Sequence, residues 1–440
     1  MLEIGIHQAS AHTGKQVRVQ GHLAAVRDLG QIAFLVLRGR TGNLSLVVEE
    51  ESLLKQIRSL SLETPVIAYG TLMPKPQGKG KSTEAQAELH LEELKALTKV
   101  LPPPPIELGR QSKMDSLAVS TLLDYRPLSL RNEKVKAIFK LEAEIVKAFR
   151  HYLESQGFTE IHSPKLVATG TEGGSQLFSV DYFGRQAYLA QSPQFYKQIM
   201  VGVFERVYEV GPVFRAEEHD STRHLNEYIS LDFEMGFIES VQDVIAMQVG
   251  LIKHMLAHLE EHCTQELALH GATLPKVETI PQITLADAMK LLRARHNWQG
   301  EGDLDGEGER LLYEHFLKEE GSEFVYVIDY PHKVRPFYAL PGPIQENGLP
   351  GSESFDLLFR GLEITTGGQR IHEYDMLVES IRARGMDEEN FRDYLLCFKH
   401  GMPPHGGLAF GLERLAKQFL GLGSVKQAAL FPRDMNRISP

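Results

Sequence analysis

Charged side chains alternate with apolar ones in the segment GPVFRAEEHDSTRHLNEYISLDFEM, residues 211–235. This alternation predicts an antiparallel hairpin with one apolar face. The other face carries Arg215 and Glu217 in the first strand, and Ser230, Asp232 and Glu234 in the second. Charges that gather on a strand inside a large domain indicate a ligand or a metal, because an unpaired buried charge is costly. A phosphate group and a Mg²⁺ ion would satisfy both signs.

A second segment, GGLAFGLERL at residues 406–415, supplies Arg414 near the C-terminus. A guanidinium group binds phosphate oxygens through two parallel hydrogen bonds, a geometry that lysine cannot reproduce. Gly406, Gly407 and Gly411 let the backbone come close to a nucleotide, because they carry no side chain. Together with residues 211–235, this segment indicates an ATP site.

The composition is that of an ordinary globular chain. Its 440 residues, 42% of them hydrophobic, can bury a large core divided between two or three domains. The apolar runs are far shorter than a bilayer span and the N-terminus lacks a secretory pattern, so we expect a cytoplasmic protein with no membrane partner. Cys263 and Cys397 stand far apart without nearby ligands, which argues against a disulfide framework or a zinc site. The net charge of −11 argues against a protein that coats nucleic acid.

The expected elements change character along the chain. Short β-rich runs before residue 100 predict a small barrel, and the segment LPPPP at residues 101–105 marks a domain boundary. Asn132 is expected to cap a long amphipathic helix that ends at Ser155, before Gly157. Further helical patterns cover residues 240–263 and 285–295, and the acidic residues 301–309 predict a solvated loop or the approach to a helix. The pattern as a whole is α+β.

Separated segments resemble the class II aminoacyl-tRNA synthetases, and within them the aspartyl-tRNA synthetases of the archaeal type. GFTEIHSPKL at residues 157–166 is similar to the first family motif, residues 211–235 to the second and residues 406–415 to the third. The resemblance implies an OB-fold anticodon-binding barrel at residues 1–101, a linker or hinge at 102–131 and a catalytic domain at 132–440. That domain would be an antiparallel β-sheet flanked by helices, with a helical insertion at about residues 240–322.

The resemblance also assigns roles around ATP. Arg215 would hold the α-phosphate and stabilise the charge that develops on it, and Arg414 would lie against adenine and meet the γ-phosphate. Glu217 and His224 would orient ATP and the acceptor end of tRNA. Arg215, Glu217 and Arg414 are the expected catalytic residues, and the rest of the expected ATP-binding set is Leu225, Tyr228 as a stacking aromatic, Glu363, Gly406 and Gly411.

The same resemblance places a metal ion and the amino acid. Glu363 and Thr366 would bind Mg²⁺ through hard oxygen ligands. Glu172 would pair with the substrate ammonium group beside Gln194, while Lys197, Arg370 and Thr366 complete the expected aspartate-binding set. Lys197 and Arg370 would place two cations where a side-chain carboxylate sits. Asparagine would leave both cations uncompensated, so the pattern favours aspartate.

The expected anticodon reader lies in the N-terminal barrel. Phe34 could stack on an anticodon base and Arg27 could bind the RNA backbone or a base edge, with packing in the core as the alternative for Phe34. The family often has glutamine at the position of Ser45. Aspartate-specific relatives carry Trp and Lys at positions that we match to His22 and Pro74. The His/Pro combination resembles the non-discriminating group, which charges both tRNA-Asp and tRNA-Asn.

The function that the resemblance implies is ATP-dependent attachment of L-aspartate to tRNA-Asp and tRNA-Asn through aspartyl-adenylate. A homodimer and a partner amidotransferase belong to the same expectation. Asparaginyl-tRNA synthetase, a tRNA-free enzyme that makes asparagine, and a synthetase-derived RNA-binding or regulatory protein are the alternatives. Lys197 and Arg370 argue against the first, the N-terminal barrel against the second, and the four charged residues of the ATP site against the third.

Overall fold

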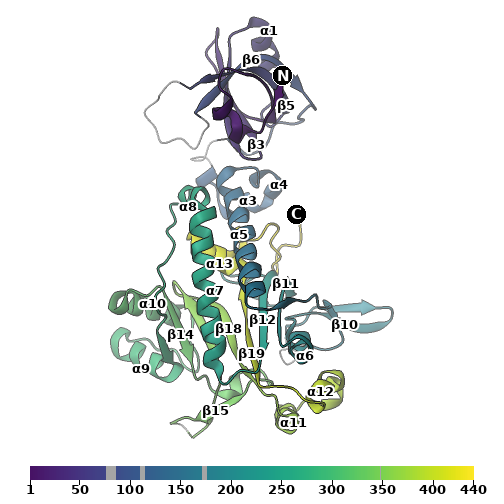
Figure 1. Cartoon of the computed structure of the whole chain (residues 1–440), viewed down its shortest axis with the longest axis vertical. Coiled ribbons are helices and arrows are strands. Elements are labelled where there is room, and N and C mark those ends of the chain that lie inside the picture. The colour runs from purple at the N-terminus through teal and green to yellow at the C-terminus, as the bar shows by residue number, and fades with distance from the viewer. Residues whose placement is uncertain (76–85, 110–113, 171–175, 347) are drawn as a thin grey trace. The chain divides into compact units, whose positions relative to one another are not determined.

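The computed structural model describes residues 1–440 except 76–85, 110–113, 171–175 and 347 (Figure 1). The chain forms two compact units, residues 1–135 and 136–440. Residues 102–131, expected as a linker, belong to the first of these units. No helix in the described ranges is long and apolar enough to cross a bilayer.

The first unit is built around a closed barrel, as predicted. Within the described part of the chain, five strands pair in the order β2, β3, β4, β6 and β5, and β5 pairs back onto β2. Alternate residues such as Val17, Val19, Leu35 and Leu37 point inward and are buried, which is the pattern that predicted the strands. The bounds are β2 Gln16–Asp28, β3 Ala33–Gly39, β4 Gly42–Val48, β5 Pro65–Pro74 and β6 Ala87–Ala96, with β1 Leu2–Glu3 parallel to β2.

Short helices complete the first unit. The barrel core also contains side chains of η1 Ile6–His12 and of α1 Glu51–Arg58, a helix that the sequence reasoning did not predict. Helices α3 Val119–Asp124 and α4 Arg126–Ser129 precede the long helix α5 Glu133–Ser155. Asn132 caps α5 as predicted, because its Oδ1 accepts the backbone N–H groups of Lys134 at 3.0 Å and Val135 at 3.3 Å. Gly157, with φ of 79°, turns the chain after the helix.

The second unit contains a large sheet. Among the described residues it has eight strands, in the order β13, β14, β17, β18, β19, β12, β11 and β7. Neighbours from β14 to β11 are antiparallel, whereas both edge pairs, β13 with β14 and β7 with β11, are parallel. The sheet is therefore antiparallel in its interior, as predicted, and parallel only at its two edge pairs. The bounds are β7 Thr159–Glu160, β11 Arg206–Phe214, β12 Glu227–Gly236, β13 Gln282–Thr284, β14 Phe324–Ile328, β17 Ser354–Phe359, β18 Leu362–Arg370 and β19 His405–Gly411.

Two long helices, α5 and α7 Val241–His262, lie side by side across this sheet (Figure 1). Phe149 of α5 and Leu251 of α7 share one apolar cluster with Phe233 of β12 and Leu408 of β19. The predicted helical patterns at 240–263 and 285–295 correspond to α7 and α9. Within residues 240–322 the chain forms helices α7 to α10, the short strand β13 and the loops that join them. The remaining helices are α6 Gln194–Phe204, α8 Thr264–His270, α9 Leu285–His296, α10 Gly306–Glu320, α11 Tyr374–Ala383, α12 Arg392–Lys399, α13 Leu412–Leu420, α14 Val425–Ala428, η2 His332–Val334 and η3 Glu388–Phe391.

Two small sheets stand apart from the large one. The first is three-stranded within the described residues, with β10 Arg185–Leu189 between β8 Leu166–Val167 and β9 Ser179–Tyr182. The second is the hairpin of β15 Pro341–Ile344 and β16 Pro350–Ser352. Neither was predicted, because strands this short carry too few alternating positions to produce a recognisable pattern.

Candidate active site

The predicted hairpin of residues 211–235 forms as β11 and β12, with two differences. First, β11 ends at Phe214, so Arg215 and Glu217 lie in the connecting loop and not on the strand. Second, consecutive residues of β12 from Ser230 to Gly236 are buried, so both faces of this strand are covered. Beyond the end of β11, hydrogen bonds from Asn226 hold the loop in position. Its Nδ2 donates to Arg215 O at 2.7 Å and Glu217 O at 3.0 Å, and its carbonyl accepts from Arg215 N at 2.9 Å.

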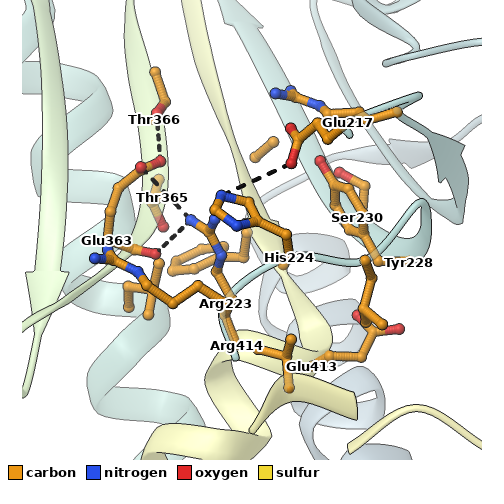
Figure 2. A pocket seen from close by; sticks show the side chains of 17 residues that line it. Glu217, Arg223, His224, Tyr228, Ser230, Glu363, Thr365, Thr366, Glu413 and Arg414 are labelled. Carbon is orange, nitrogen blue, oxygen red and sulfur yellow. Dashed lines mark hydrogen bonds and ion pairs between the residues drawn. The ribbon is translucent and has the colours of Figure 1, made fainter. Parts of the chain in front are cut away.

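A cavity of about 290 Å³ opens beside this loop (Figure 2). Its walls come from residues 215–230, from β18, and from the end of β19 with the first turn of α13. The structure brings together most of the expected ATP-binding residues, namely Arg215, Glu217, His224, Leu225, Tyr228, Glu363, Gly411 and Arg414. Gly406 does not line this cavity. A Cβ at Gly406 would lie 2.8 Å from Gly368 O and 2.9 Å from Val244 Cγ2, so this glycine permits close packing of the sheet and its covering helix.

Hydrogen bonds fix Glu363 on one wall of the cavity (Figure 2). Arg414 Nη1 donates to Glu363 O at 2.8 Å and lies 3.5 Å from Glu363 Oε2, and Thr366 Oγ1 donates to Glu363 Oε1 at 2.9 Å. Burial acts to raise the pKa of Glu363, but Arg414 and the Thr366 hydroxyl outweigh it, and the net pKa is lowered. Glu363 therefore stays ionised, and its charge faces the cavity.

The opposite wall carries Glu217 and His224 (Figure 2). His224 Nε2 lies 3.7 Å from Glu217 Oε2, and its Nδ1 is 2.6 Å from Ser221 Oγ. Burial lowers the pKa of His224, with further lowering by Arg414 and Arg223 against the opposing effect of Glu217. A neutral imidazole in this position can act as a hydrogen-bonding group without adding a charge. Tyr228 packs with Leu225 and Val425 at the inner end of the same wall.

A second, larger cavity of about 590 Å³ adjoins the first. Arg215, Glu363, Thr366 and Ala409 line both cavities. Gln194 and Lys197 reach the larger cavity from the first turns of α6, and Arg370 reaches it from the end of β18. Glu172 lies outside the described residues, so its expected place beside them stays a prediction. The other expected aspartate-binding residues all border one cavity.

The two cations of this cavity already have carboxylate partners. Lys197 Nζ is 3.1 Å from Asp232 Oδ1 and 3.3 Å from Glu234 Oε2, and Arg370 Nε donates to Glu234 Oε1 at 2.9 Å. Burial acts to raise the pKa of Glu234, but Arg370 and Lys197 outweigh it and lower the pKa. The sequence pattern predicts that a substrate carboxylate compensates Lys197 and Arg370. It does not reveal their pairing with the carboxylates of β12, which are distant in sequence.

Asp356 and Arg335 are site residues that sequence reasoning missed. Both line the larger cavity, where Arg335 Nη2 is 2.9 Å from Asp356 Oδ2 and its guanidinium carbon lies 3.7 Å from the centroid of the Tyr330 ring. Asp356 is opposite Thr366 in the β17–β18 register. Burial raises the pKa of Asp356, and the nearby Glu363 raises it further against the effect of Arg335. A single aspartate inside the apolar run FDLLF was the available signal.

The carboxylates of Asp356 and Glu363 fit a Mg²⁺ ion better than a metal that needs many protein ligands. The described residues contain no group of three or more His, Cys, Asp or Glu side chains that could hold a metal. Mg²⁺ is usually held by one or two carboxylates together with water and substrate phosphates. A bound cation would also relieve the repulsion between Asp356 and Glu363, which raises the pKa of Asp356.

In the barrel, Arg27 and Phe34 lie opposite each other on β2 and β3. The Phe34 side chain is 38% exposed, which excludes the alternative that it packs in the core. Ser45 Oγ accepts a hydrogen bond from Lys75 Nζ at 3.2 Å.

His22 and Pro74 are not brought together. The Cα partner of His22 on β5 is Pro65, at the first residue of the strand, whereas Pro74 is the last residue of β5. Burial and Arg38 lower the pKa of His22. His22 and Pro74 would therefore have to act on RNA separately.

Family models and known relatives agree with this architecture. Residues 118–435 match the model of tRNA synthetases class II (D, K and N), and residues 17–97 match that of an OB-fold nucleic acid binding domain. The chain is 46% identical to an aspartate–tRNA(Asp/Asn) ligase of Thermus thermophilus over 100% of both chains. It is also 46% identical to the ligase of the same name from Deinococcus radiodurans, over 98% of this chain and 97% of that protein.

A solved structure gives the same picture. An asparaginyl-tRNA synthetase from Pyrococcus horikoshii, complexed with asparaginyl-adenylate, superposes with a TM-score of 0.90 at 29% identity, covering 99% of each chain. The fold is thus shared with a synthetase named for asparagine, whereas the two relatives above are named for aspartate. The backbone fold alone therefore does not determine the amino acid, and the choice must depend on side chains. By its family model, its full-length relatives and its fold, the chain belongs to the class II tRNA synthetases of the D, K and N group.

Proposed function

We propose that this chain uses ATP to attach L-aspartate to tRNA-Asp and tRNA-Asn through an aspartyl-adenylate. The observation that carries the proposal is the pair of adjoining cavities that share Arg215. The smaller cavity has the arginines and glycine expected around a nucleotide, and the larger one has fixed cations suited to an acidic amino acid. The names of the two full-length relatives support the same substrate and both tRNAs.

In the first step, an oxygen of the aspartate α-carboxylate attacks the α-phosphorus of ATP and pyrophosphate leaves. Arg215 lines both cavities, so its guanidinium can hold the α-phosphate while the amino acid approaches from the larger cavity. Arg414 and Arg223 line the smaller cavity, where they can bind the phosphates that depart. No protein nucleophile is needed, because positioning and charge stabilisation supply the catalysis.

Selection of aspartate rests on hydrogen-bond donors that are already fixed. Asp232 and Glu234 balance the charges of Lys197 and Arg370, so the cluster attracts the substrate by its donor pattern more than by excess charge. Arg370 donates through Nε to Glu234 and through Nη2 to Gly407 O, and these bonds fix the plane of its guanidinium at the wall of the larger cavity. A side-chain carboxylate accepts from such donors through both oxygens. The amide of asparagine turns an NH₂ group toward them and is disfavoured.

Glu363 and Asp356 are the residues that would hold Mg²⁺, with Thr366 fixing the Glu363 carboxylate. When bound, Mg²⁺ neutralises charge on the ATP phosphates. In the second step, a hydroxyl of the terminal ribose of tRNA attacks the aspartyl carbonyl and AMP leaves. Arg27 and Phe34 on the barrel are suited to a cationic contact and a stacking contact with the anticodon.

The proposal places the enzyme in the cytoplasm as a homodimer, as the family resemblance implies. An aspartyl group on tRNA-Asn carries a carboxylate where asparagine has an amide. A cell that uses this product for asparagine therefore needs an amidotransferase partner to convert it.

The first test is ATP–pyrophosphate exchange with aspartate or asparagine as the substrate. We expect exchange with aspartate, and a loss of at least about a hundredfold in Arg215→Ala. Arg392→Ala, at a position whose side chain is 78% exposed on α12, is the matched control and should leave exchange unchanged. Exchange that requires asparagine would identify the asparaginyl alternative. RNA binding without any exchange would support the regulatory alternative.

The second test separates the two tRNAs. Aspartylation of purified tRNA-Asp and tRNA-Asn transcripts should proceed with similar kcat/KM. A strong preference for tRNA-Asp would reject dual charging while leaving aspartate activation intact. The two experiments therefore test the amino acid and the nucleic-acid partner independently.

A further inference from the structure

The acidic segment at residues 301–309 lies within the catalytic unit and is not simply a solvated approach to a helix. Asp303 lines the larger cavity, and Glu309, in the first turn of α10, is only 7% exposed. Asp305 caps α10, because its Oδ1 accepts the Gly308 N–H at 2.7 Å and the indole N–H of Trp298 at 3.0 Å. Trp298 is itself buried. The first turn of α10 is therefore anchored before any ligand arrives.

Two residues of this turn form a cradle around Arg223, which lies in the loop between β11 and β12. Arg223 Nη2 forms an ion pair with Glu309 Oε2. A Cβ at Gly306 would approach Arg223 Nη1 more closely than non-bonded atoms allow, so a residue with a side chain at this position would make the guanidinium shift. Arg223 lines the smaller cavity beside His224 (Figure 2). Its guanidinium is thus held from α10, 86 residues away along the chain.

The same carboxylate reaches a second wall of the cavity. Glu309 Oε2 accepts the backbone N–H of Glu363 at 3.0 Å, at the start of the β18 segment that faces the cavity. One oxygen atom therefore joins the loop that carries Arg223 to the strand that carries Glu363. Burial raises the pKa of Glu309, and Arg223 opposes that change, which makes the ionised carboxylate dependent on its arginine partner.

We propose that Glu309 is a positioning residue for the nucleotide, which fixes Arg223 and the backbone of Glu363 and so makes the insertion helix α10 part of the ATP site. The inference rests on the proposed use of ATP and adds to it a residue outside the family motifs. Glu309 itself need not touch ATP. Its effect passes through the guanidinium of Arg223 and the strand of Glu363.

Three variants separate positioning from general stability. Glu309→Gln keeps the size of the side chain and removes the charge that orders Arg223. Gly306→Ala keeps Glu309 and makes the guanidinium of Arg223 shift, while the higher helix propensity of alanine favours α10. Arg223→Ala removes the group that is positioned. Glu307→Gln is the matched control, because Glu307 directly follows Gly306 and its side chain is 67% exposed.

The measurement is ATP–pyrophosphate exchange with separate KM values for ATP and aspartate, together with calorimetric titration of ATP into the full-length protein. We expect Glu309→Gln and Gly306→Ala each to raise the KM and the dissociation constant for ATP by about tenfold, because a charge-assisted contact is lost or displaced. The KM for aspartate should stay within about twofold, and Glu307→Gln should resemble the wild type. In an Arg223→Ala background, Gly306→Ala should have no further effect.

Two results would overturn the inference. One is unchanged ATP affinity in both Glu309→Gln and Gly306→Ala. The other is an equal loss of ATP and aspartate affinity with a lower melting temperature, which would indicate a structural role only. These outcomes differ from failure of the proposed function. If the wild type binds ATP but shows no exchange with aspartate, the proposed function fails, while the calorimetric comparison of the variants still decides whether Glu309 positions the nucleotide.

Discussion

Lys197 Nζ lies 3.1 Å from Asp232 Oδ1 and 3.3 Å from Glu234 Oε2, and the lysine is only 1% exposed. The ammonium group is carried by α6, and its contacts are the two carboxylates of β12 and Leu408 O of β19 at 3.1 Å. A buried cation held by partners on two strands cannot turn away into solvent. The proposed selection of aspartate depends on this fixed geometry. Because a substitution of Lys197 would leave two buried carboxylates without their cation, we choose the neighbouring Arg370 for the test.

Arg370→Lys should weaken aspartate binding while preserving the charge. A lysine ammonium lacks the planar fork with which Arg370 donates to both Glu234 and Gly407 O, so the cation at this wall of the cavity would lose its fixed orientation. We expect the KM for aspartate in pyrophosphate exchange to rise by roughly tenfold or more, with the KM for ATP nearly unchanged. Arg382→Lys, where the side chain is 63% exposed on α11, is the control. A rise in the ATP KM alone would show that Arg370 does not serve the amino acid.

Glu413 gives the fold a pH dependence with a defined sign. Burial raises the pKa of Glu413 to about 7, from 4.5. The folded pKa is above the unfolded one, so its contribution to stability is full below pH 4.5 and is lost as the pH rises through 7. The loss amounts to roughly 3 kcal/mol. Glu413→Gln should remove this decline, because an amide does not ionise, and its oxygen can still accept the Ile229 N–H that the carboxylate now accepts.

Thermal unfolding of Glu413→Gln and wild type at several values between pH 5 and pH 8 checks this expectation. The advantage of the variant should grow as the pH rises. Glu260→Gln, at an exposed position of α7, should follow the wild type. Parallel curves for Glu413→Gln and wild type would show that Glu413 does not titrate in this range.

Phe34→Ala should affect tRNA and leave amino-acid activation alone. The ring is exposed on the barrel opposite Arg27, where it can stack on a base. We expect the KM for tRNA in aspartylation to rise roughly tenfold, which corresponds to the loss of one stacked base. Pyrophosphate exchange without tRNA should be unchanged. Leu62→Ala, equally exposed at 38%, is the matched control, and an equal effect of both variants would contradict a specific stacking role.

Glu63→Ala should destabilise the barrel. Glu63 is 3% exposed and makes two hydrogen bonds with Arg38, at 2.9 Å and 2.6 Å, and Arg38 is also buried. Removing one partner of a buried ion pair leaves an uncompensated charge and costs about 3–5 kcal/mol. Amide hydrogen exchange of β3 and β5 in the full chain should therefore accelerate. Glu51→Ala, at an 80% exposed side chain on α1, should not change the exchange rates of those strands.

Local signals in the sequence were sufficient for much of the fold. The Asn132 cap predicts the start of α5, because its side chain bonds to backbone groups two and three residues ahead. Strict alternation predicts the barrel strands, since one face of each strand is buried. The same rule failed for β12, which is buried on both faces and whose charged residues pair with groups from α6 and β18.

The missed parts of the site depend on contacts between residues distant in sequence. Glu309 and Arg223 form an ion pair although they are 86 positions apart, and no local sequence pattern predicts that they are partners. Asp356 is hidden in an apolar strand, and its relation to Glu363 appears only when β17 and β18 pair. The alternation continues past Phe214 and predicts Arg215 on a strand. In the structure β11 ends at Phe214, and Asn226 holds Arg215 through both its side chain and its backbone carbonyl.

Arg215, Glu363, Thr366 and Ala409 border both cavities. Attempts to reprogram the enzyme for another amino acid through these four positions will disturb its handling of the nucleotide as well, since each side chain serves two compartments. Gln194 and Ser354 border the larger compartment alone. Directed evolution toward a new substrate is therefore expected to accumulate productive changes at that pair and to leave the shared quartet intact.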